Sequence, residues 1–218
     1  MTEELSPRER RHQRTQQAIL DAALEIIHEK GVDGLSIRAI ADKIDYSPAG
    51  LYEYYGSKEE IIAALCMQGL ERFGRHLASV DRSLPTEEYM GRLGLAYVDF
   101  AMKNSDFFLL MFTTAPIFFP QYIKDSMPDP AAPDSTDLAL HLENDDAFMI
   151  LVRGVERCVA EGIFKLQPDF STLEMAHSFW SMAHGIAMLQ LTALQQMPYN
   201  EQSALKALRV LFDGMRSQ

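Results

Sequence analysis

Apolar residues recur at helical spacing from one end of the chain to the other, and no segment shows the alternation of a β-strand. The first such run covers about residues 14–30 and is followed by Gly31, a residue suited to the left-handed end of a helix. Two short helices are expected next, one over 37–44 and one starting at Pro48. The whole pattern predicts an all-α protein of about nine helices.

Longer helices are expected in the rest of the chain. Ser57 and Glu60 have the spacing of a reciprocal capping box, which predicts the start of a helix that continues to Val80. The prolines within residues 116–136 predict a loop. The remaining helices are expected from Pro85, after a break at 104–106, and over about 137–161, 170–196 and 200–216.

Residues 37–54 place two short helices around a tight turn, Asp45-Tyr46-Ser47. An ordinary helical hairpin would explain the apolar positions at which the two helices meet. It would not explain why the second helix presents small and hydroxyl side chains, which allow close approach to phosphates and base edges. The exposed set on this helix is Ser47, Ala49, Gly50, Tyr52 and Glu53. The pattern favours a helix-turn-helix.

Three ordered motifs within residues 14–62 resemble the N-terminal domain of the TetR family of bacterial transcriptional regulators. They are Gly34-Leu35-Ser36-Ile37-Arg38-Ala39-Ile40-Ala41, Ser47-Pro48-Ala49-Gly50-Leu51-Tyr52-Glu53-Tyr54-Tyr55 and Ser57-Lys58-Glu59. The family often has Gly-Val where this chain has Asp45-Tyr46. Asp tolerates a left-handed turn, and Tyr46 is expected to fill the apolar position. The resemblance implies a DNA-binding domain over 14–60 and an effector-binding and dimerisation domain over 61–218.

The resemblance also implies roles for individual residues. Arg38 matches a position that can reach a base edge or a phosphate. The start of the recognition helix is matched by Ser47, Pro48, Ala49 and Gly50. Tyr52 and Lys58 match positions that hold the DNA backbone, and Tyr54 is expected to be partly core and partly contact.

Four arginines precede or open the first helix, namely Arg8, Arg10, Arg11 and Arg14. Residues 1–13 are therefore expected to form a flexible basic arm. Two interpretations stay open at this stage: the arm adds phosphate or minor-groove contacts, or it is a solvated tail.

In the C-terminal part, Phe179–Gly185 resembles the Trp-x3-His-Gly signature of one family subclass, and Asp106–Phe112 also looks like that subclass. Trp180 and His184 lie four residues apart and share a helix face, so they could line one cavity. The expected effector-binding residues are Phe108, Met111, Phe112, Trp180 and His184. A core histidine and a plain apolar core are the competing interpretations. A flexible apolar lining suits a hydrophobic or aromatic ligand.

Charge narrows the class of protein without deciding it. The 218 residues include 20 Lys+Arg and 31 Asp+Glu, a net charge of -11, and residues 1–60 hold eight basic and twelve acidic side chains. Such a balance argues against a non-specific DNA-coating protein but is compatible with a few positioned phosphate contacts. The N-terminus lacks the apolar core of a signal peptide and no clean run of ~20 apolar residues occurs. The sequence therefore predicts a cytoplasmic protein with no membrane partner.

No metal-ligand spacing, nucleophile motif or Gly-rich phosphate loop is present, and Cys66 and Cys158 follow no metal or redox pattern. We therefore expect no catalytic residues, no metal and no cofactor. The leading hypothesis is a homodimeric repressor that pairs through its last two helices. A small, largely apolar effector would release it from double-stranded operator DNA. An all-α enzyme using His184 and a helical interaction protein without DNA contact are the alternatives.

Overall fold

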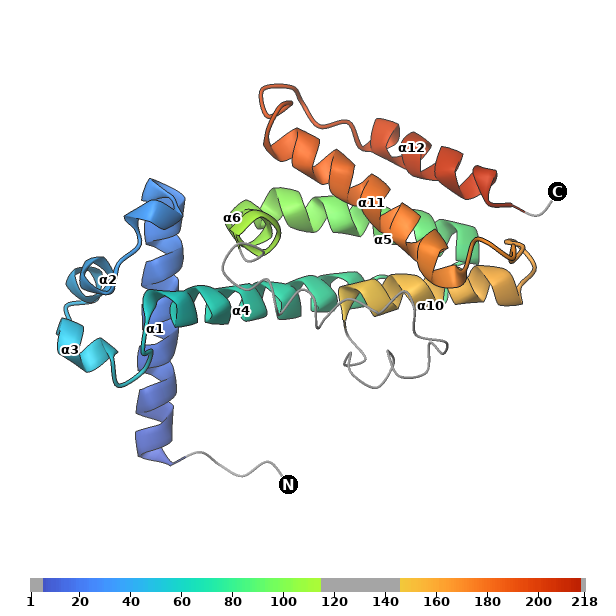
Figure 1. Ribbon diagram of the computed structural model, residues 1–218. Helices are drawn as coiled ribbons and strands as arrows, with labels where there is room; N and C mark the ends of the chain where they lie inside the picture. Colours follow the sequence, from blue (N-terminus) through green and yellow to red (C-terminus); the bar gives the residue numbers. More distant parts are fainter. Residues whose placement is uncertain (1–5, 115–145, 217–218) are drawn as a thin grey trace. The chain divides into compact units, whose positions relative to one another are not determined.

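The computed structural model describes residues 6–114 and 146–216 (Figure 1). In these two ranges the regular elements are nine α-helices, one short 3-10 helix and one π-helical turn, and no strand is formed. The prediction of an all-α fold is confirmed. The loop predicted over 116–136, and residues 137–145 of a predicted helix, lie outside the described residues.

The described residues form two compact units. The first contains residues 6–68 and 109–114, and the second contains 69–108 and 146–216. Helix α4, Lys58–Ala78, contributes to both. The division falls inside this helix, after Gln68, and the predicted DNA-binding domain over 14–60 lies within the first unit.

Helix α1, Pro7–Lys30, begins seven residues before the predicted start. Ser6 caps it: its hydroxyl accepts from the Glu9 amide at 3.3 Å, and its own amide donates to the Glu9 carboxylate at 2.7 Å. This reciprocal pair satisfies two N-terminal donors and explains why the helix starts here. The prediction of a flexible arm is therefore wrong for residues 7–13. The helix ends at Gly31, whose φ of 70° confirms the predicted left-handed stop.

The rest of the first unit is built from short elements. A 3-10 turn, η1, covers Val32–Gly34, and helices α2, Ile37–Lys43, and α3, Pro48–Leu51, follow. The hydroxyls of Ser36 and Ser47 cap α2 and α3 by accepting from the amides of Ala39 and Gly50. Helix α2 packs on both α1 and α3. The fully buried side chains of this small core include Ile19, Ala23, Ile40, Ala41 and Leu51.

Helix α4 begins close to the predicted capping box, but only half of that box forms. The Ser57 hydroxyl accepts from the Glu60 amide at 3.1 Å, as expected. The Glu60 carboxylate accepts instead from the amide of Gly56, at 2.7 Å. The Glu60 carboxylate therefore binds the amide one residue before the expected partner, that of Gly56 instead of that of Ser57.

The second unit is organised around α5, Thr86–Lys103. Helices α10, Ala147–Ala160, α11, Thr172–Leu191, and α12, Glu201–Gly214, all pack on α5 (Figure 1). A Cβ atom at Gly94 would lie 2.5 Å from a methyl carbon of Leu208, so the glycine permits the close approach of α12. Helix α6, Ser105–Leu109, continues into the π-helical turn η2, Leu110–Thr114.

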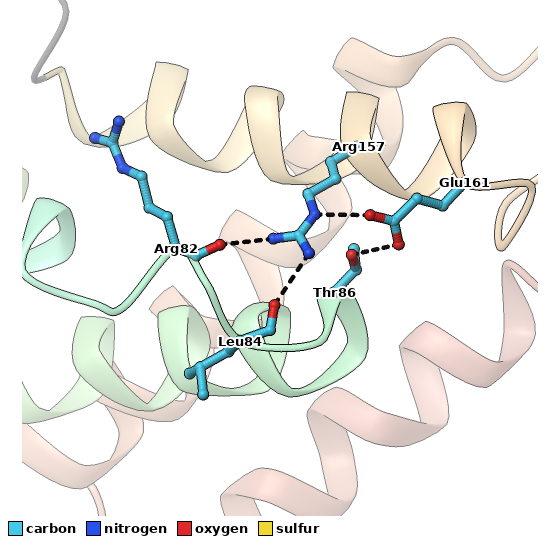
Figure 2. A network of polar contacts seen from close by, with 5 residues as sticks. All are labelled: Arg82, Leu84, Thr86, Arg157 and Glu161. Carbon is cyan, nitrogen blue, oxygen red and sulfur yellow. Dashed lines mark hydrogen bonds and ion pairs between the residues drawn. The ribbon is translucent and has the colours of Figure 1, made fainter.

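A polar network ties the end of α10 to the loop between α4 and α5 (Figure 2). The guanidinium of Arg157 donates to the backbone carbonyls of Arg82 at 2.9 Å and Leu84 at 3.0 Å. It also pairs with Glu161 at 2.8 Å, and the other oxygen of that carboxylate accepts from the hydroxyl of Thr86 at 2.5 Å. Arg157 therefore holds the loop between α4 and α5, and Glu161 holds the first residue of α5.

Candidate functional site

In the turn between α2 and α3, the structure agrees with the sequence prediction at Asp45 and differs from it at Tyr46. Asp45 adopts a left-handed conformation, with φ of 54°. Tyr46 was expected to fill an apolar position, and this expectation is wrong because its side chain is 41% exposed. Tyr46 instead interacts with Tyr54, and a hydrogen bond to that residue raises the pKa of the Tyr46 hydroxyl.

The first turn of α3 presents a surface that is nearly free of bulky side chains. Ser47, Pro48 and Ala49 are exposed, and Gly50 is half-buried. The hydroxyl of Ser47 accepts from the amide of Gly50 at 3.0 Å, which holds the turn in shape. A Cβ at Gly50 would lie 2.6 Å from the ring of Tyr46. The glycine is therefore needed for the packing of that ring as well as for a bare surface.

Three other predicted DNA-contacting residues belong to the same unit. Arg38 is exposed on α2, and Tyr52 is 58% exposed directly after α3. Tyr54 is half-buried, and its ring stacks on that of His12, with 4.6 Å between centroids and 24° between planes. The contribution of His12 was not anticipated from the sequence, because no local motif joins it to the recognition helix.

Lys58 has a partner within the protein. Its ammonium group donates to the backbone carbonyl of Val32 at 2.8 Å, and the side chain is half-buried. This bond attaches the start of α4 to η1. A role in holding the DNA backbone stays a prediction, and the geometry adds a structural role that competes with it.

In the second unit the predicted residues Trp180 and His184 lie in a cluster of aromatic rings. The ring of Trp180 meets those of Tyr97, Phe148 and Phe73 edge-on, with centroids 5.0, 5.6 and 5.7 Å apart. The predicted residue Phe108 is fully buried, and its ring is tilted against that of His184 at 5.5 Å. The sequence brings Trp180 and His184 together through helical spacing, whereas their partners come from other helices and carry no local signal.

One polar contact lies inside this cluster. The hydroxyl of Tyr97 is 2.8 Å from Nδ1 of His184. Burial lowers the pKa of His184 and raises that of Tyr97. Both shifts favour the neutral forms, so the pair is an uncharged hydrogen bond among apolar rings.

The space available for a ligand differs between two places in the second unit. The cavity beside Tyr97 and Trp180 has a volume of about 20 Å³, which is close to the room that one water needs. A groove between α5 and α12 has a volume of about 680 Å³, within the range of small-molecule sites. Its lining combines apolar and charged side chains, among them Met90, Leu95, Phe212, Glu88, Arg92 and Lys206.

The other two predicted effector residues belong to the first unit. Met111 is buried and Phe112 is half-buried, and both lie in η2. Their part in an effector site stays a prediction. Within residues 6–114 and 146–216, His, Cys, Asp and Glu side chains form no group of three that could hold a metal ion. None of the helices described has the length and apolar character needed to cross a bilayer.

Family profiles match both parts of the chain. The profile described as "Bacterial regulatory proteins, tetR family" matches residues 19–65, and "Tetracyclin repressor-like, C-terminal domain" matches residues 90–211. The chain belongs to the TetR family. The protein is therefore a helix-turn-helix transcriptional regulator, and the α2-turn-α3 segment is its helix-turn-helix. The Trp-x3-His-Gly subclass stays a prediction.

Individual proteins are similar to this chain in sequence or in fold. The HTH-type transcriptional regulator YobS of Bacillus subtilis is 34% identical over 94 residues, which cover 43% of this chain and 49% of YobS. The chain thus matches about half the length of that relative. A protein of unknown function from Rhodococcus sp. RHA1 has a similar fold, with a TM-score of 0.69 and 20% identity. The match covers 93% of this chain and 95% of the Rhodococcus protein. The TetR-family regulator PfmR from Thermus thermophilus also has a similar fold, with a TM-score of 0.64 and 20% identity. The match covers 91% of this chain and 99% of PfmR.

Proposed function

We propose that the protein is a homodimeric repressor that binds a palindromic operator through α3 and is released by a small, largely apolar effector. The observation that carries the proposal is the bare first turn of α3. Ser47, Pro48 and Ala49 are exposed there, and a hydroxyl cap holds the turn rigid. A helix start of this kind can approach base edges in the major groove without a steric barrier.

Neighbouring side chains suit contacts to the DNA backbone. Arg38 is exposed on α2 and forms no ion pair with the described residues. Tyr52 exposes 58% of its surface next to α3, which is a high value for a large aromatic side chain. A guanidinium and a phenol can both donate to phosphate oxygens, and such contacts fix the register of the recognition helix.

The dimer is supported by the surface of the last two helices, which lie side by side (Figure 1). Leu189 on α11 is 52% exposed and Val210 on α12 is 74% exposed. Gly185 and Gly214 have open space where a side chain would point, so another helix could pack closely there. Two copies related by a two-fold axis would present two α3 helices to half-sites about one turn, or ~34 Å, apart.

The apolar character of the effector is supported by the rings around Trp180. Because the cavity there holds only about 20 Å³, an effector must displace rings to enter. The neutral Tyr97–His184 pair would offer it one polar contact. A ligand with a large apolar body and few polar groups fits this lining best.

The experiment is selection of bound genomic DNA fragments by the purified protein, followed by a gel shift with a recovered duplex. Ala49→Leu places a bulky side chain on the bare turn and should abolish the shifted band. Ala193→Leu is the matched control, because Ala193 is an exposed alanine in the turn after α11. The control should bind like the wild type.

Two results would contradict DNA binding through the first turn of α3. One is that no genomic fragment is enriched over a random pool by the wild-type protein. The other is that Ala49→Leu, with its helical circular dichroism intact, binds the recovered duplex as tightly as Ala193→Leu. A shift of the operator complex whose stoichiometry is one chain per duplex would exclude the dimer.

A further inference from the structure

The basic N-terminal part of α1 is a fixed element and not an appendage. The capping box at Ser6 starts the helix at Pro7, so Arg8 and Arg11 lie on regular helix. His12 then stacks on Tyr54. Tyr54 in turn meets the ring of Tyr46 edge-on, with centroids 6.3 Å apart.

These three rings connect α1 to the recognition helix. The ring of Tyr46 lies over Gly50, as the 2.6 Å approach to a Cβ at that position shows. A continuous row of contacts therefore runs from α1 through His12, Tyr54 and Tyr46 to the first turn of α3. All of these residues belong to the first unit. The row holds the start of α1 in a defined place next to the DNA-reading turn.

The arginines carried by this part of α1 are available. Arg8 lies one helical turn before His12 and on the same face, and Arg11 lies three residues from Arg8. Both are exposed, and their guanidinium groups contact no carboxylate or carbonyl of the described residues. Arg14 differs, because its Nε donates to the carbonyl of Arg10 at 3.2 Å.

Two lysines of the first unit are already engaged within the protein, whereas Arg38 on α2 is exposed. Lys43 pairs with Glu25 at 2.9 Å and Glu29 at 3.3 Å, and Lys58 donates to the carbonyl of Val32. A chain with a net charge of -11 needs positioned cations to approach DNA at all. Arg8 and Arg11, on the part of α1 that the ring contacts connect to the recognition helix, can supply them in addition to Arg38.

We propose that Arg8 and Arg11 bind phosphates of the operator next to the groove that α3 enters, and that His12, stacked on Tyr54, positions them. The partner is double-stranded DNA, and the contact is to its backbone and carries no sequence information. The inference rests on the proposed DNA-binding function. It adds a second DNA-contacting element, separate from the helix-turn-helix.

The test is the salt dependence of binding to a duplex recovered by genomic selection and to a scrambled duplex of equal length. Each lost phosphate contact lowers the slope of log K against log salt by about 0.9. Arg8→Gln/Arg11→Gln should therefore lower the slope by roughly 1.8 and weaken binding to both duplexes by the same factor. Arg75→Gln/Arg92→Gln removes the same charge from exposed pairs with Glu71 and Glu88, and should leave the slope unchanged.

The positioning role of His12 has its own readout. His12→Ala should lower the slope and speed amide hydrogen exchange over residues 8–12, whereas His12→Phe keeps a ring for stacking and should restore both. An unchanged slope in Arg8→Gln/Arg11→Gln, with wild-type binding intact, would overturn the inference and leave the proposed function standing. A loss of slope in the arginine variant but in neither His12 variant would overturn the positioning role. Failure of the wild-type protein to bind any selected duplex would count against the proposed function itself.

Discussion

The hydroxyl of Tyr97 on α5 lies 2.8 Å from Nδ1 of His184 on α11, inside a cluster of aromatic rings. The two residues are 87 positions apart, so the contact couples two helices that pack along each other. Because burial lowers the pKa of His184, the imidazole is held neutral. Protonating it would place a charge among apolar rings, which is costly.

This pair predicts how stability depends on pH. A histidine with a lowered folded-state pKa binds fewer protons in the folded protein than in the unfolded chain. The stability that it contributes is therefore fully present above about pH 6.5, the ordinary pKa of histidine. As the pH falls below that value, the free energy of unfolding should fall until the folded-state pKa is passed. Urea unfolding between pH 7.5 and 5 measures this change, which should be smaller in His184→Gln than in the wild type.

A control comes from His76, which lies 3.1 Å from the carboxylate of Asp99. His76→Gln removes another histidine of the second unit, and this variant should lose as much stability at low pH as the wild type. Equal pH dependence in the wild type and His184→Gln would show that the Tyr97 contact tolerates an imidazolium.

The Arg157 network predicts a large effect from a residue outside any DNA or effector site (Figure 2). Arg157→Ala removes the donor to the Arg82 and Leu84 carbonyls and leaves Glu161 with Thr86 alone. Hydrogen bonds from a charged donor are worth about 1.5–3 kcal/mol, and the loss of stability should be about 2 kcal/mol because the side chain is partly exposed. Arg157→Lys should recover little, since an ammonium cannot reproduce the planar fork.

Urea unfolding at pH 7 measures this loss, with Arg92→Ala as the reference. Arg92 forms an exposed pair with Glu88 on one helix, worth about 0.3–0.5 kcal/mol. If Arg157→Ala costs no more than Arg92→Ala, the loop between α4 and α5 is held by its apolar contacts instead.

Local chemistry explains which parts of the fold could be predicted from the sequence. The caps at Ser36 and Ser47, the left-handed Asp45 and the stop at Gly31 depend on residues within a few positions of one another. Such signals are visible in a single sequence. The start of α1 was missed although Ser6 and Glu9 form a capping box, because four arginines in the first turns suggested a solvated arm.

Contacts between distant segments could not be predicted in the same way. No periodicity relates Tyr97 to His184, or His12 to Tyr54, since each pair is joined only by the packing of helices. The family resemblance matched Lys58 to a position that holds the DNA backbone, and it gave no sign of the hydrogen bond to the carbonyl of Val32. Motif spacing identified the residues of the helix-turn-helix, while the tertiary contacts decide which of their side chains are free.

Gly50 predicts a double-mutant result. Gly50→Ala should weaken DNA binding because the new methyl group displaces the Tyr46 ring toward the surface of α3. If the ring is the cause, Tyr46→Ala should restore binding in the Gly50→Ala background. Fluorescence anisotropy with a selected duplex measures the four variants. A defect that Tyr46→Ala leaves unchanged would assign the need for glycine to the DNA surface alone.

Tyr52 and Lys58 predict different consequences of the same change to alanine. Tyr52→Ala should weaken binding to specific and scrambled duplexes by a similar factor. The stability of the protein should not change, since the ring is exposed. Lys58→Ala should cost about 1 kcal/mol of stability by removing the donor to Val32. If Lys58 also binds a phosphate, the slope of log K against log salt should be lower by about 0.9 in Lys58→Ala than in the wild type. An unchanged slope would make the role of Lys58 structural.

Trp180 predicts how an effector would act on DNA binding. The ring of Trp180 meets that of Phe73, which lies on α4, and α4 begins at Lys58 shortly after the recognition helix. An effector that displaces Trp180 would therefore move Phe73 and with it α4. The effector can change operator affinity only by its preference for one state, typically ~5–150-fold. Trp180 is the only tryptophan of the chain, so its fluorescence should change during titration with any compound that releases the operator.

The variants separate this pocket from the groove between α5 and α12. Trp180→Ala should bind the operator normally without effector and need at least about five times more effector for release. Trp180→Phe, which keeps a ring against Phe73, should lie between it and the wild type. Leu205→Arg changes the groove, where Leu205 is 41% exposed, and should leave the release curve unaltered. The opposite result, an altered curve in Leu205→Arg and a normal one in Trp180→Ala, would move the effector to that groove. Loss of operator binding without effector in both Trp180 variants would make the ring part of the core that supports α4.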